Sequence, residues 1–75
     1  MKKAKTVLAY NLKRLRQAKG MTQEKLAELT NLNFRTIGRI ENGQCFCKAE
    51  TLDLLVKALD VTITDLFSLE KSNIC

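Results

Sequence analysis

The segment Thr22–Gly43 constrains the fold of this chain more than any other feature. It contains two short helical patterns separated by only a few residues. Thr22 is a preferred residue for the N-cap of the first helix, and Asn33 is one for the second. Between them, Asn31 accepts the left-handed backbone conformation of a turn more readily than most residues. The segment therefore predicts two short helices joined by a tight turn.

The second of these helices, expected at 33–41, has two different faces. Ile37 and Ile40 are three residues apart and are expected to face a core. Arg35 and Arg39 are four residues apart and share another face. Because an arginine can donate to O6 and N7 of one guanine, such a helix suits the major groove of DNA. The alternative is that both arginines are ordinary surface residues.

The rest of the chain predicts an all-α fold. It lacks proline and has three glycines, and its apolar residues recur at helical spacing. A first helix is expected from Thr6, as N-cap, to about Lys19, with Gly20 ending it. A fourth is expected at 49–59, and a fifth opens with Thr62 and Asp65 as a capping box. Ile63, Leu66 and Phe67 of this last helix are expected to face one way.

Five helices predict one compact helix bundle, with the helix-turn-helix formed by the second and third. The expected single domain spans 1–75, with its core at about 6–67. Residues 1–5 are expected to form a flexible basic arm, and the chain from Ser68 onward a short tail. Gly38 costs the third helix about 0.5–1 kcal/mol relative to alanine, so a close contact with another helix or with DNA is expected there.

The positive charge is unevenly distributed. The net charge is +5, and residues 1–20 contain no acidic residue, whereas residues 48–75 are mildly acidic. A basic half indicates a polyanionic partner, most simply nucleic acid. The alternative is a solvated lysine-rich surface without a partner, and charge alone does not decide between them.

The cysteines do not form a familiar site. Cys45 and Cys47 flank Phe46 in an expected loop, and Cys75 is the last residue. With three cysteines and no histidine, the chain supplies neither the usual four cysteine and histidine ligands of a zinc site nor a histidine that could activate a thiol. We expect ordinary reduced thiols, with redox sensing or metal binding as the alternatives.

The sequence argues against several classes of protein. No glycine-rich phosphate loop, secretory signal or membrane-length apolar run is present. We therefore expect no enzyme activity, metal or cofactor, no membrane contact and no small-molecule substrate, and a cytoplasmic location.

In these features the chain resembles a known family, the XRE helix-turn-helix transcriptional regulators, which include the lambda repressor-like and Cro-like proteins. The resemblance covers Asn11–Phe67 and centres on Gln-x3-Ala-x9-Ile-x2-Ile, which occurs at Gln23, Ala27, Ile37 and Ile40. It implies a lambda repressor-like DNA-binding domain.

The resemblance implies a role for individual residues. Those that would contact bases in the recognition helix are Asn33, Phe34, Arg35, Thr36 and Arg39. Those that would contact phosphates are Thr22, Gln23, Asn42, Gly43 and Lys48. It also implies a structural ion pair between Arg16 and Glu41.

Some positions leave more than one interpretation open. Gln23 could instead be a solvated residue of the first helical turn. Phe34 replaces a hydrogen-bonding side chain and could either extend the core or contact a thymine methyl group. Phe46 could tuck under its loop or mark a partner surface.

The function that follows is binding to a double-stranded DNA operator as a sequence-specific transcriptional regulator. A homodimer is expected, with Leu54 or Ile74 in its surface. The alternative is a protein-interaction module of the same fold, either the antitoxin of a toxin–antitoxin pair or a coactivator bridge.

Overall fold

The computed structural model describes residues 3–68, and all its regular elements there are helical. The helices are α1 (Ala4–Ala18), α2 (Gln23–Thr30), α3 (Phe34–Glu41), α4 (Ala49–Leu59) and α5 (Ile63–Leu66). The predicted all-α five-helix fold is confirmed, and so are the bounds of the fourth helix. Residues 1–2 and 69–75 lie outside the described range, and with them lie Ile74 and Cys75.

Side-chain caps set the starts of three helices. The Thr22 hydroxyl accepts from the Lys25 amide at 3.0 Å, and Asn33 Oδ1 accepts from the Arg35 amide at 2.7 Å. Thr62 and Asp65 form a reciprocal capping box at α5. These three predicted N-caps are confirmed. They could be predicted because each hydrogen bond joins residues only two or three apart in sequence.

The predicted start of the first helix is wrong. α1 begins at Ala4, and Lys3 is its N-cap without a side-chain hydrogen bond. Thr6 is an interior residue whose amide donates to the Lys3 carbonyl at 3.0 Å. The helix therefore takes in two residues expected in the arm, since a favourable capping side chain does not compel a helix to start there.

Four of the five helices, α1 to α4, are terminated by a residue in the left-handed conformation. Gly20 has a φ of 72°, Asn31 of 60°, Gly43 of 76° and Asp60 of 58°. The predicted roles of Gly20 and Asn31 as turn residues are confirmed. Asp60 ends α4 in the same way, although no sequence pattern predicted a left-handed residue there.

All five helices contribute to one apolar core. The fully or almost fully buried members are Leu8, Leu12, Leu26, Ala27, Ile37, Ile40, Leu55, Leu59 and Leu66. α3 contacts α1 and α2 through its isoleucine side, as predicted. Ile63 does not share the buried side of Leu66, although the two were expected to face one way, because Ile63 is 44% exposed and Leu66 is fully buried. A helix of one turn is too short for its apolar spacing to define a buried face.

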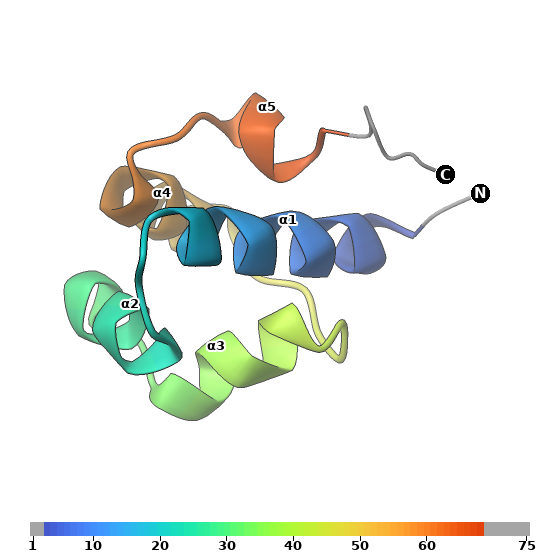
Figure 1. The fold of residues 1–75 in the computed structure, drawn as a ribbon. Helices are drawn as coiled ribbons and strands as arrows, with labels where there is room; N and C mark the ends of the chain where they lie inside the picture. Colours follow the sequence, from blue (N-terminus) through green and yellow to red (C-terminus); the bar gives the residue numbers. More distant parts are fainter. Residues whose placement is uncertain (1–2, 69–75) are drawn as a thin grey trace.

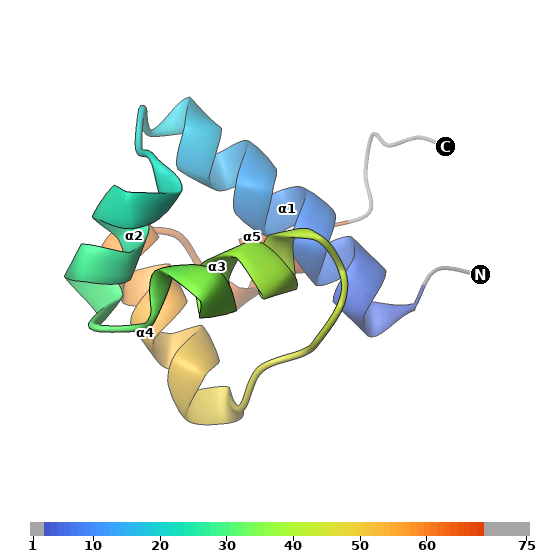
Figure 2. The same ribbon diagram turned by 90° about the horizontal axis from the view of Figure 1, so that it is seen from below.

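The arrangement leaves α3 at the surface. Figure 1 shows α3 beneath α1, with α2 at one end and α5 on the opposite side of α1. Seen from below, α3 lies in front of the other helices, and no described helix crosses over it (Figure 2). The side of α3 that points away from the core is therefore open to a partner.

Candidate nucleic-acid interface

The open side of α3 carries the side chains expected to meet bases. Arg35 and Arg39 are exposed, Asn33 is an exposed cap, and Thr36 is half-buried. Within residues 3–68, neither arginine forms a salt bridge or donates a side-chain hydrogen bond. Both guanidinium groups are thus available, four residues apart on one helix, to accept a ligand from the solvent side.

Phe34 is not a core residue. It is 48% exposed at the first turn of α3, although it lies three residues before the buried Ile37. The structure therefore disfavours the interpretation that Phe34 extends the core. An aromatic ring at this place offers apolar contact to whatever approaches the start of α3.

A buried ion pair joins α1 to the end of α3. Arg16 Nε lies 2.6 Å from Glu41 Oε2, and the side chain of Glu41 is 1% exposed. Arg16 Nη2 also donates to Glu41 Oε1 at 3.1 Å, and Nη1 donates to the Met21 carbonyl at 2.6 Å. This bidentate geometry holds the last turn of α3 at a fixed position on α1.

Gln23 completes that arrangement instead of being freely solvated. Its Nε2 donates to Glu41 Oε1 at 3.0 Å, so the first residue of α2 also contacts the end of α3. The backbone amides of Gln23 and Glu24 have no acceptor among residues 3–68. Free amides at the start of a helix, together with the positive end of its dipole, attract an anion.

The chain after α3 uses most of its amides internally. The Gly43 amide donates to the Ile40 carbonyl at 3.1 Å, and the Gln44 amide donates to the Arg39 carbonyl at 3.0 Å. The Asn42 amide donates to the Gly38 carbonyl at 3.0 Å. This is a Schellman motif, which requires the left-handed Gly43. The amides of Asn42 and Gly43 are thus already occupied. The exposed Asn42 side chain and Lys48 are left to meet a phosphate here.

The loop at 44–48 contains two half-buried thiols and an aromatic contact. Cys45 and Cys47 are free and pack against the core. Burial raises the pKa of the Cys47 thiol, and the nearby Cys45 raises it further. A thiol that resists ionisation is a poor nucleophile. The half-exposed Phe46 lies beside Phe67, with ring centroids 6.2 Å apart, so it neither tucks fully under the loop nor stands alone.

One structural residue escaped the sequence analysis. Asn11 is 1% exposed, and its Nδ2 donates to the carbonyls of Leu66 and Ser68, both at 3.0 Å. The side chain therefore ties the end of α5 to α1. The available signal was a polar residue in the apolar stripe that contains Leu8, Leu12 and Leu15.

Within the described chain, no three His, Cys, Asp or Glu side chains gather as metal ligands do. Over the same residues, no helix has the length and apolarity that a bilayer span needs.

An exposed, arginine-bearing third helix, locked to α1 and preceded by a capped second helix, defines a helix-turn-helix DNA-binding protein. A family model described as helix-turn-helix matches residues 12–66, and the chain belongs to this family. It is therefore a DNA-binding transcriptional regulator.

Individual relatives include two control proteins of similar size. The chain is 33% identical over 64 residues to control protein C.SmaI of Serratia marcescens, covering 85% of this chain and 76% of that one. It superposes on the restriction-modification controller protein C.AhdI of Aeromonas hydrophila with a TM-score of 0.80 and 35% identity, covering 84% and 96% of the two chains. The chain also superposes on an HTH_3 family transcriptional regulator from Vibrio cholerae with a TM-score of 0.82 and 27% identity, covering 88% of this chain and 37% of that one.

Proposed function

We propose that the protein binds a specific operator in double-stranded DNA by inserting α3 into the major groove. The observation that carries the proposal is the open side of α3, where Arg35 and Arg39 are exposed and have no partner within residues 3–68. On this view Asn33, Phe34 and Thr36 contact base edges or methyl groups beside them.

Phosphate contacts on either side of the groove would hold α3 in register. One DNA strand would be contacted at its phosphates by Thr22, Gln23 and the free amides at the start of α2. The phosphates of the other strand would be contacted by the Asn42 side chain and Lys48, and Gly43 forms the turn that follows Asn42. The ion pair of Arg16 and Glu41 sets the angle at which α3 projects.

We further propose that the protein acts as a cytoplasmic homodimer. In helix-turn-helix dimers, two recognition helices about 34–36 Å apart read half-sites one helical turn apart. Leu54, which is 41% exposed on α4, is a candidate for the dimer surface. The 35% identity to the restriction-modification controller protein C.AhdI, over 84% of this chain, supports control of restriction-modification genes.

Two measurements test this function. Selection of bound sequences from a pool of random duplexes should yield a palindromic site, and sedimentation with that duplex should show two protomers. Affinity should then fall by orders of magnitude between roughly 50 and 200 mM salt. A salt-independent affinity, or a pool that shows no enrichment, would contradict the proposal.

A further inference from the structure

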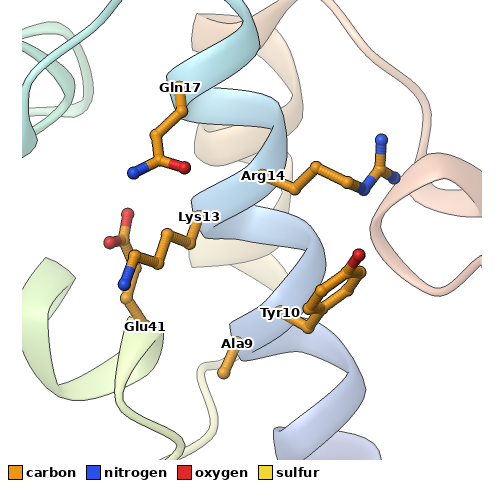
Figure 3. Close-up of a pocket in the computed structure, with 6 residues that line it drawn as sticks. All are labelled: Ala9, Tyr10, Lys13, Arg14, Gln17 and Glu41. Atoms are coloured by element: carbon orange, nitrogen blue, oxygen red, sulfur yellow. The ribbon is translucent and has the colours of Figure 1, made fainter. Parts of the chain in front are cut away.

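α1 presents polar side chains next to the end of the recognition helix. An open hollow of about 420 Å³ lies between α1 and the last residue of α3 (Figure 3). It is lined by Ala9, Tyr10, Lys13, Arg14, Gln17 and Glu41. None of the α1 residues in this set was expected to contact a ligand.

The carboxylate at the edge of this hollow is already neutralised. Glu41 accepts two hydrogen bonds from Arg16 and one from Gln23. Lys13 lies in the hollow, but no salt bridge joins it to Glu41 or to any other described acid. The ammonium group of Lys13 therefore contributes a positive charge that no described residue balances.

The side chains of α1 divide between two directions. Lys13 and Gln17 project toward the side on which Glu41 ends α3, whereas Arg14 projects toward α5 (Figure 3). Arg14 is also held there, because its Nη2 donates to Asn11 Oδ1 at 3.0 Å. Gln17 donates no side-chain hydrogen bond within residues 3–68. One cation and one free amide thus face the recognition helix.

These two side chains adjoin the anion-binding start of α2. Gln23, the first residue of α2, reaches Glu41 at 3.0 Å, and Glu41 also borders the hollow that contains Lys13 and Gln17. The start of α2, and the hollow that Lys13 and Gln17 line, therefore both adjoin Glu41 at the end of α3. A single negative charge with several acceptor oxygens, such as a phosphodiester, matches one ammonium and neighbouring amide donors.

We propose that Lys13 and Gln17 extend the phosphate-binding edge from α2 onto α1, so that α1 contacts the backbone of the strand flanking α3. The inference rests on the proposed DNA-binding function and adds two contact residues to it. Lys13 supplies charge and thus a salt-dependent contact, while Gln17 supplies a neutral hydrogen bond.

The test is the salt dependence of DNA affinity for Lys13→Gln. Fluorescence anisotropy would be measured with the selected duplex and with a duplex of random sequence. Losing one phosphate contact should reduce the slope of log affinity against log salt by about 0.9. Affinity should drop by a similar factor for both duplexes, because a phosphate contact carries no sequence information. Gln17→Ala should weaken binding and leave the slope unchanged.

Two variants control for charge and folding. Lys57→Gln removes the same charge from the exposed last turn of α4, which contacts α2 and α5, and should keep the full slope. Lys13→Arg retains the charge and should restore the slope. If Lys13→Gln and Lys57→Gln behave alike while the wild-type slope is steep, the inference fails and the DNA-binding function stands. A wild-type protein without salt-dependent binding would instead overturn the function itself.

Discussion

The guanidinium of Arg16 and the carboxylate of Glu41 form a bidentate pair, with Nε to Oε2 at 2.6 Å and Nη2 to Oε1 at 3.1 Å. The two residues are 25 positions apart in sequence, so the pair connects the middle of the chain to its first helix. Gln23 donates to the same carboxylate, and α2 is thereby tied into the contact. All three helices that would position a DNA ligand thus converge on one buried acid.

Replacing only one member of this pair should be costly. Arg16→Met leaves the Glu41 carboxylate buried with only the Gln23 amide as a donor, and should lower the free energy of unfolding by about 3–5 kcal/mol. The double replacement Arg16→Met with Glu41→Leu removes both charges and should cost much less. Urea denaturation of the two variants gives the comparison. Equal losses for both would mean that the buried charge is not what destabilises the single variant.

Asn11→Leu should loosen the end of α5. The substitution removes the donor for the carbonyls of Leu66 and Ser68 while keeping a similar volume. Because the substitution leaves these carbonyl acceptors unsatisfied, the free energy of unfolding measured by urea denaturation should fall by about 1–3 kcal/mol. For Gln17→Ala, a control at an exposed position of the same helix, the free energy of unfolding should stay within about 0.5 kcal/mol of the wild-type value. A neutral Asn11→Leu would show that these hydrogen bonds add nothing to stability.

The capping box of α5 should make stability depend on pH in acid. The Thr62 amide donates to Asp65 Oδ2 at 3.0 Å, and hydrogen bonding to Thr62 lowers the pKa of Asp65 from its ordinary 3.8. The ionised carboxylate is thus favoured in the folded state. Its contribution is fully present above pH 3.8 and is lost as the pH falls through the lowered pKa of the folded protein. Asp65→Asn cannot titrate, so its urea midpoint should fall less over this acid range than that of the wild type. Parallel curves would contradict the assignment.

Gly38→Ala should affect stability and DNA binding in opposite directions. A Cβ atom at Gly38 would meet no atom from outside the surrounding backbone of α3 within 4 Å, so packing within the described protein does not require glycine there. Alanine should therefore raise the free energy of unfolding by about 0.5–1 kcal/mol through helix propensity. If α3 approaches DNA closely at this point, the added methyl group should weaken binding. An increase in stability with unchanged affinity would rule out close approach at Gly38.

The parts of the fold that the sequence predicted correctly depend on local chemistry. The caps at Thr22, Asn33 and Thr62 each act over two or three residues, so a short stretch of sequence contains both partners. The burial of Ile37 and Ile40 follows from helical spacing over a helix of two turns. Spacing does not place Ile63 with the buried Leu66, because α5 has four residues, too few for spacing to identify a face.

The contacts that the sequence could not supply depend on how helices dock. Asn11 meets the end of α5 across more than fifty positions, and Gln23 meets Glu41 across eighteen. Neither partner can be recognised from its own neighbours in the chain. Lys13 and Arg14 point in different directions because adjacent residues of a helix project about 100° apart. Which neighbouring helix each of them faces depends on docking. The charge distribution predicts a basic half of the chain. The packing of α1 against α3 and α5 is needed to distinguish Lys13, which we propose contacts a ligand, from Arg14, which is held by Asn11.

Arg39→Ala should alter base preference without altering stability. Arg39 is exposed on the open side of α3 and has no partner within residues 3–68, so the free energy of unfolding should change by less than about 0.5 kcal/mol. Losing a bidentate base contact should weaken binding to the selected duplex by about 1–3 kcal/mol and relax the preference at one base pair. Lys57→Ala provides an exposed control on α4. Selection from random duplexes that returned the wild-type profile for Arg39→Ala would place the determinant of specificity elsewhere on α3.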